Sequence, residues 1–200
     1  LPENRWEADK AVIKYLSAVH SIDLSKINAD MNIFIRPHWK SEMNKKAVEC
    51  FFPDKRVPLL KTLNNIMESS QTLFSPSCFI AGEPHPKHWG IRKDQTLVLF
   101  EWQNIGVATP AIDLAAVISS SENKNTSMNV AKIYLESLGT IDQNKNSINK
   151  LSNDILKGCV WNYIYFLSNY IDKKIKAPEK LIQYIIDYFP EWIGNTDICL

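Results

Sequence analysis

The side chains most able to do chemistry are concentrated between residues 83 and 101. Glu83, His85 and His88 lie in one polar turn, and Glu101 lies near the end of the apolar run that follows. A carboxylate in such a turn can orient a hydroxyl group or hold a cation, and an imidazole nitrogen can bind a transition metal. The residue types therefore indicate metal binding or the orientation of a hydroxyl-bearing substrate in this short stretch.

Two short apolar segments must position these side chains. Cys78–Ala81 and Thr96–Trp102 are rich in residues that favour strands and are bounded by turn residues. Two strands of this length do not form an independently stable sheet. We therefore predict a small β insert on a helical body, in which the ends of two neighbouring strands bring residues 83, 88 and 101 together in one solvent-accessible hollow.

Helical periodicity dominates the rest of the chain. Apolar residues recur every three or four positions, which predicts helices over about 3–20, 41–52, 57–69, 112–119, 128–138, 148–171 and 178–189. Ser41 is expected to cap the second of these helices, and residues 120–127 are expected to form a polar loop. The predicted fold class is therefore mainly α with a small β insert (α+β).

The composition fits a single globular domain of 200 residues. The formal charge of +1 gives no sign of a nucleic-acid-binding face, and no apolar run approaches the length of a membrane span. The amino-terminal sequence lacks the apolar core of a signal peptide, and the four cysteines form no CxxC pair. We therefore expect a cytoplasmic protein without a nucleic-acid or membrane partner.

Three segments together resemble the catalytic core of the aminoglycoside phosphotransferase and choline kinase family, which has the protein-kinase fold. The family turn reads roughly H-G-D-x-H-x-x-N, and the matching residues are Ala81-Gly82-Glu83-Pro84-His85-Pro86-Lys87-His88. The family strand ends in I-D-W, which Phe100-Glu101-Trp102 matches, and Ala111-Ile112-Asp113-Leu114-Ala115 is similar to the Y-D-L-A segment downstream. Leu16–Ile22 is similar to an L-x-x-L-H segment of the family.

The resemblance covers about residues 1–190 and implies that residues 1–200 form one domain, the large carboxy-terminal lobe of a kinase-like fold. It implies that Glu83 orients the acceptor hydroxyl and that His88 and Glu101 contact the metal between the nucleotide phosphates. The implied cofactors are ATP and Mg²⁺, and the implied partner is a small polar or cationic compound with a hydroxyl group. The family's amino-terminal nucleotide lobe has no counterpart in this chain, so that lobe is a further expected partner.

Three positions of the turn depart from the family pattern, and Glu101 stands where the family strand has an aspartate. Glu83 is one methylene longer than the family aspartate, and a displacement of that order can cost about 10²-fold in rate. His88 offers nitrogen where the family has an amide, which suits Mn²⁺ or Zn²⁺ better than Mg²⁺. Ala81 replaces the first histidine of the family turn. Two functions therefore stay open: a phosphotransferase with weakened chemistry, or an inert pseudokinase that serves as a binding module.

Other interpretations compete with these roles. Glu83, His85, His88 and Glu101 could instead gather around a transition metal, because H-x-x-H with a carboxylate is a possible ligand set. Asp113 is expected to cap the helix that follows it and to brace the turn. His20 is expected to be a structural histidine, and the indoles of Trp89 and Trp102 are expected to pack in the core rather than stack on a ligand.

Overall fold

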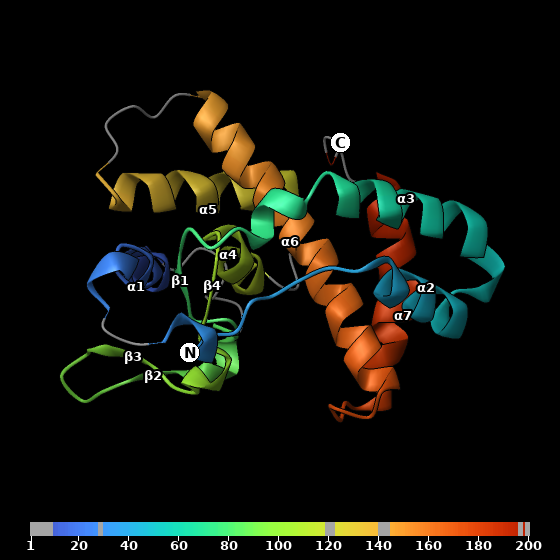
Figure 1. The fold of residues 1–200 in the computed structure, drawn as a ribbon, viewed down its shortest axis with the longest axis horizontal. Coiled ribbons are helices and arrows are strands. Elements are labelled where there is room, and N and C mark those ends of the chain that lie inside the picture. The colour runs from blue at the N-terminus through green and yellow to red at the C-terminus, as the bar shows by residue number, and fades with distance from the viewer. Residues whose placement is uncertain (1–9, 28–29, 119–122, 140–144, 196–197, 199–200) are drawn as a thin grey trace. The chain divides into compact units, whose positions relative to one another are not determined.

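The computed structural model describes residues 10–27, 30–118, 123–139, 145–195 and 198 (Figure 1). These residues form helices over most of their length, together with two small antiparallel sheets. This confirms the prediction of a mainly helical fold with a small β insert. The chain divides into two compact units: residues 1–37 with 72–159, and residues 38–71 with 160–200.

The first unit holds both sheets. Its elements are α1 (Lys10–His20), β1 (Cys78–Ile80), β2 (Trp89–Ile91), β3 (Leu97–Leu99), β4 (Gly106–Ala108), α4 (Ala111–Val117), α5 (Lys124–Ser137) and the part of α6 (Lys145–Ile171) up to Cys159. Helix α1 packs along α5 and against β1. Its apolar positions Val12, Ile13 and Leu16 are fully buried, as the helical spacing predicts.

The four strands pair in an order that the sequence did not indicate. Strand β1 pairs with β4, with Cys78 opposite Ala108, and β2 pairs with β3, with Trp89 opposite Leu99. The two strands predicted as neighbours therefore belong to different two-stranded sheets, and that part of the prediction is wrong. Each of them pairs with a three-residue segment, and segments that short carry no recognisable alternation.

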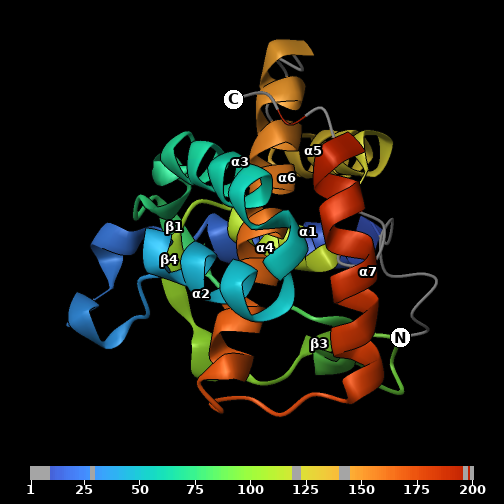
Figure 2. The same cartoon turned by 90° about the vertical axis from the view of Figure 1, so that its right-hand side faces the viewer.

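The second unit is helical. It contains α2 (Ser41–Phe51), α3 (Arg56–Glu68), α7 (Glu179–Asn195) and the part of α6 from Val160 onward (Figure 2). Aromatic rings on α6 and α7 pack together, with centroid separations of 5.2 Å for Tyr163 and Phe189 and 5.9 Å for Tyr163 and Trp192. Tyr163 of the long helix therefore packs against the aromatic residues of α7.

Several helix ends differ from the predicted ones. The N-cap of α2 is Lys40 rather than Ser41, which is the first helical residue. Helix α5 begins at Lys124, inside the predicted polar loop, because the Asn123 side chain accepts a hydrogen bond from the Thr126 amide. Helix α7 continues through Pro190. The first residues of the helix predicted over 3–20, and the end of the one predicted over 112–119, lie outside the described residues.

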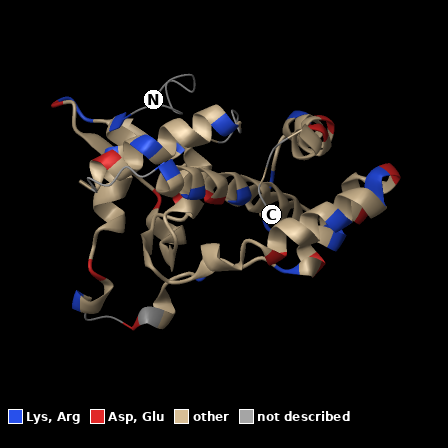
Figure 3. Ribbon diagram, turned by 90° about the horizontal axis from the view of Figure 1, so that it is seen from above, with Lys and Arg blue, Asp and Glu red and all other residues tan. Residues whose placement is uncertain are grey.

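Charged residues of both signs are interspersed along the chain (Figure 3). Surface pairs such as Lys150 with Asp154 and Lys132 with Glu136 span one turn of a helix. In the part of the chain that the structure describes, no helix combines the length and the apolar character that a membrane span needs.

The glycines of α6 and α7 give a matched test of packing. A Cβ atom on Gly158 would lie 2.9 Å from the Cβ of Ala115 and 3.1 Å from the carbonyl oxygen of Ala111, whereas one on Gly194 would meet nothing within 4 Å. We expect Gly158→Ala to lower the free energy of unfolding by about 1–2 kcal/mol through overpacking, despite the better helix propensity of alanine.

The control substitution Gly194→Ala should instead raise the free energy of unfolding by about 0.5 kcal/mol, because alanine stabilises the helix and has free space there. Urea unfolding of both variants checks the pair. Equal effects of the two substitutions would contradict close packing of α6 on α4 at Gly158.

Candidate functional site

A buried carboxylate holds the polar turn that follows β1. Asp113, the third residue of α4, accepts hydrogen bonds from the backbone amides of Ala81 at 2.7 Å and Gly82 at 2.9 Å. Its side chain is fully buried and lies 3.0 Å from Nε2 of His20. The expected bracing of the turn is therefore confirmed. The expected helix cap is not, because the Asp113 carboxylate points to the turn rather than to the first amides of α4.

A chain of hydrogen bonds fixes the tautomer of His20. Burial raises the pKa of Tyr134 well above its ordinary value, and the negative charge of Asp113 acts in the same direction. The tyrosine hydroxyl therefore keeps its proton, and its oxygen lies 3.1 Å from Nδ1 of His20. Nε2 of His20 lies 3.0 Å from Oδ2 of Asp113, and because a carboxylate oxygen only accepts, Nε2 carries a proton and donates it to Asp113. His20 is thus a structural histidine, as predicted.

The same surroundings suppress the reactivity of Cys78. Burial raises the pKa of this thiol to about 12, and the charge of Asp113 adds to the effect. At neutral pH the group is a thiol, and its Sγ lies 3.3 Å from the carbonyl oxygen of Ala108 on the paired strand. Cys78 therefore acts as a small core residue beneath the turn.

Glu83 is held by a residue that the sequence did not indicate. The Asn104 side-chain amide donates a hydrogen bond of 2.7 Å to Oε2 of Glu83. The contact depends on a close approach of two turns, since a Cβ atom on Gly82 would lie only 2.0 Å from the carbonyl oxygen of Asn104. Gly82 also has a φ of +85°, which only glycine adopts without strain. The exposed Glu83 carboxylate thereby gains a fixed position.

His88 and Glu101 face each other beside Glu83. Nε2 of His88 lies 3.4 Å from Oε2 of Glu101, and Nδ1 of His88 lies 2.8 Å from the backbone carbonyl oxygen of Glu83. The Phe100 amide donates to the carbonyl oxygen of His88 at 2.7 Å, which ties the two strand ends together. We call Glu83, His88, Glu101 and Asn104 the turn site. His88 and Glu101 thus meet through their side chains, whereas Glu83 reaches His88 through its backbone carbonyl oxygen and directs its carboxylate to Asn104. Neither hollow found on the described residues is lined by these three residues, so the predicted common hollow is not observed.

Glu101 adopts a strained backbone conformation. Its φ of 59° and ψ of 68° place it in the left-handed region, which costs a residue with a side chain about 1–3 kcal/mol. The Gln103 side chain donates a hydrogen bond to Oε2 of Glu101 at 3.1 Å. The Glu101 side chain is 54% exposed. Strain of this kind is concentrated at functional sites, because it holds a side chain in a fixed direction.

A larger metal cluster does not form among the residues that the structure describes. No three of their His, Cys, Asp and Glu side chains are gathered closely enough to hold a metal ion. The His85 ring lies 5.9 Å from the His88 ring between centroids, and its Nδ1 accepts a hydrogen bond from the Lys87 amide. His88 and Glu101 therefore offer two protein ligands, and an ion there would take the others from a bound molecule or water.

Both tryptophans near the turn site pack against the protein. Trp89 is buried, its indole NH donates to the Pro84 carbonyl oxygen, and its ring meets that of Tyr15 edge to face at 5.2 Å. The Trp102 indole donates to the Leu99 carbonyl oxygen. The predicted core position is confirmed for Trp89, whereas Trp102 is only half-buried.

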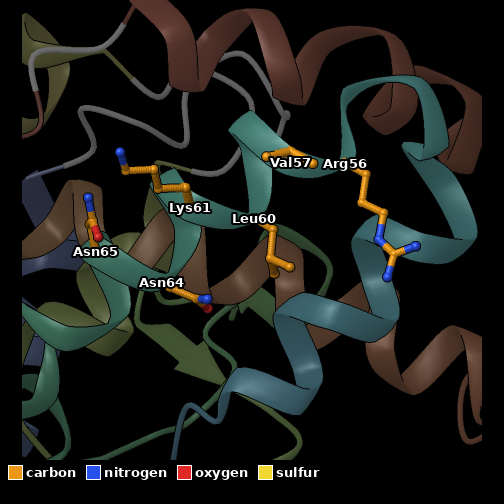
Figure 4. Close-up of a pocket in the computed structure, with 6 residues that line it drawn as sticks. All are labelled: Arg56, Val57, Leu60, Lys61, Asn64 and Asn65. Carbon is orange, nitrogen blue, oxygen red and sulfur yellow. The ribbon is translucent and has the colours of Figure 1, made fainter.

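Two hollows lie on the surface of the described residues. One of about 130 Å³ lies on the β2–β3 hairpin and is lined by Gly90, Ile91, Arg92, Val98 and Phe100. The other, of about 400 Å³, is a shallow depression along α3 in the second unit (Figure 4). Only the first is contiguous in sequence with the turn site, because Phe100 precedes Glu101 and Gly90 follows His88 by two residues.

The buried carboxylate gives a direct test of the brace. Asp113→Ala leaves two backbone amides and the ring of His20 without their acceptor, so we expect the free energy of unfolding to fall by about 3–5 kcal/mol. Asp154→Ala removes only the surface contact with Lys150 and should cost at most about 0.5 kcal/mol. Urea unfolding measures both. A loss below about 1 kcal/mol for Asp113→Ala would show that the brace contributes little.

Comparisons with known proteins found no match to this chain. No family model, no curated protein and no solved structure matches the chain. The resemblance to the aminoglycoside phosphotransferase and choline kinase family thus depends on the sequence segments themselves and on the contacts between them.

Proposed function

We propose that this protein is an ATP-dependent, small-molecule phosphotransferase of the aminoglycoside and choline kinase type. It would transfer the γ-phosphate of ATP to a hydroxyl group of a small polar or cationic acceptor. The observation that carries the proposal is the grouping of Glu83, His88 and Glu101 on two adjoining turns, with an ion-pair distance of 3.4 Å between His88 and Glu101. The resemblance predicts that these residues act together.

Glu83 is the residue that would orient the acceptor. Asn104 occupies its Oε2, and Oε1 is the oxygen that would accept a hydrogen bond from the acceptor hydroxyl. Phosphoryl transfer requires little covalent chemistry from the protein, and it depends on holding the acceptor oxygen in line with the phosphorus atom. The contact with Asn104 limits where the longer side chain of Glu83 can lie.

The exposed apolar side chains of Ile91 and Phe100 support a ring-bearing ligand. Ile91 and Phe100 expose about half of their surface, at 50% and 53%, and the hollow that they line is contiguous in sequence with His88 and Glu101. Ligand sites combine apolar walls with a few polar groups that fix orientation. A nucleotide base against the hairpin, with its phosphates toward Glu101, would use both features.

The residues at the metal position do not fit Mg²⁺. This cation requires a near-octahedral set of oxygen ligands at about 2.0–2.1 Å, and it binds through carboxylates, phosphates and water. The Glu101 carboxylate meets that requirement, whereas the imidazole nitrogen of His88 does not. This mismatch favours a second candidate function, an inert pseudokinase that serves as a binding module, since a kinase-like lobe does not by itself establish catalysis.

Turnover and nucleotide binding separate the two functions. The full-length protein is titrated with ATP in the presence of Mg²⁺ or Mn²⁺ by calorimetry, and phosphate transfer is measured with a panel of aminoglycosides and choline-like alcohols. We expect Glu83→Gln to retain nucleotide binding and to lose at least about 10²-fold in turnover, since the neutral amide orients the hydroxyl poorly.

The control for Glu83→Gln is Glu136→Gln, which changes an exposed carboxylate on α5 that pairs with Lys132 at 3.9 Å. Its turnover should equal that of the unmodified protein, and circular dichroism should show both variants folded. If nucleotide produces no binding heat and no thermal shift in the presence of any metal, the binding module is the favoured function. Turnover that survives Glu83→Gln would remove the role assigned to Glu83.

A further inference from the structure

The orientation of His88 defines which of its nitrogens can meet a ligand. Nδ1 lies 2.8 Å from the backbone carbonyl oxygen of Glu83, and a carbonyl oxygen can only accept a hydrogen bond. Nδ1 therefore carries a proton and donates it. Nε2 is the nitrogen that faces Oε2 of Glu101, and in the neutral ring it presents a lone pair to that carboxylate oxygen.

This is the arrangement of a metal-binding histidine. Histidines that ligate metals almost always donate the proton of their other ring nitrogen to a carbonyl or carboxylate oxygen, which fixes the ring. His88 has such a partner in the backbone carbonyl oxygen of Glu83, and its side chain is 16% exposed. Gln103 similarly holds the Glu101 carboxylate through Oε2.

The separation of the two facing atoms matches two ligands of one ion. A proton-bridged pair between imidazolium and carboxylate has an N···O distance of about 2.7–2.9 Å, and the observed 3.4 Å is longer. Both atoms can therefore be ligands of one cation, and the imidazole nitrogen decides which cations fit the pair.

We propose that the turn site takes a first-row transition cation of the Mn²⁺, Co²⁺ and Zn²⁺ kind in place of Mg²⁺, with Nε2 of His88 and Oε2 of Glu101 as its protein ligands. The inference rests on the proposed function, because nucleotide phosphates complete the coordination. Imidazole nitrogen binds such cations well, and Mg²⁺ poorly. Since no third His, Cys, Asp or Glu joins the pair among the described residues, the cation binds weakly without nucleotide.

The test measures the affinity of a non-hydrolysable ATP analogue for the full-length protein in the presence of Mg²⁺, Mn²⁺ or Co²⁺. We expect the analogue to bind at least about tenfold tighter with Mn²⁺ or Co²⁺ than with Mg²⁺. His88→Asn restores an amide oxygen and should remove this preference. His85→Asn, which changes the neighbouring histidine of the same turn, should leave the preference intact.

A second measurement uses the unmodified protein and does not depend on the folding of any variant. Pulsed electron paramagnetic resonance of Mn²⁺ with the bound analogue should detect coupling to a histidine nitrogen. Labelling with ¹⁵N-histidine should change that signal, which distinguishes imidazole from the nitrogens of adenine. A signal that is insensitive to the label, or equal affinities with Mg²⁺ and Mn²⁺, would overturn the inference and leave nucleotide binding standing. Absence of analogue binding with every cation would overturn the inference together with the proposed function.

Discussion

The geometry of the turn site depends on one buried carboxylate. Asp113 accepts hydrogen bonds from the amides of Ala81 and Gly82 and from His20, and the position of Glu83 follows from where that backbone is held. A buried carboxylate with three donors tolerates little displacement, because any lost donor leaves charge uncompensated in an apolar interior. The core of the first unit thus sets the direction of an exposed acid.

His20 and His88 differ in role because their ring nitrogens contact different groups. Both rings have one nitrogen bound to a group that fixes the tautomer, yet His20 meets Tyr134 and Asp113 in the interior, while His88 meets a carbonyl oxygen and an accessible carboxylate. A satisfied ring in the core stabilises the fold. The second nitrogen of His88 instead faces an exposed carboxylate at the surface, where both groups can meet a ligand.

The features that the sequence predicted depend on local periodicity, and those it missed depend on distant partners. The spacing of apolar residues located α2, α3 and α6, and the motif resemblance placed Glu83, His88 and Glu101 in one group. Asn104 was missed because the carboxylate that it contacts lies 21 residues earlier in the chain. The pairing of β1 with β4 was missed because a three-residue strand has no period to detect.

The pairing of the four strands also sets the positions of Glu101 and Asn104 in the turn site. Glu101 and Asn104 lie on the segment that leaves β3 and enters β4, and the registers of both sheets are fixed at its ends. Inserting or deleting one residue there would either reverse the faces of a paired strand or move Asn104 away from Glu83. Chain length between residues 99 and 106 is therefore under tighter constraint than the surface exposure of this segment suggests.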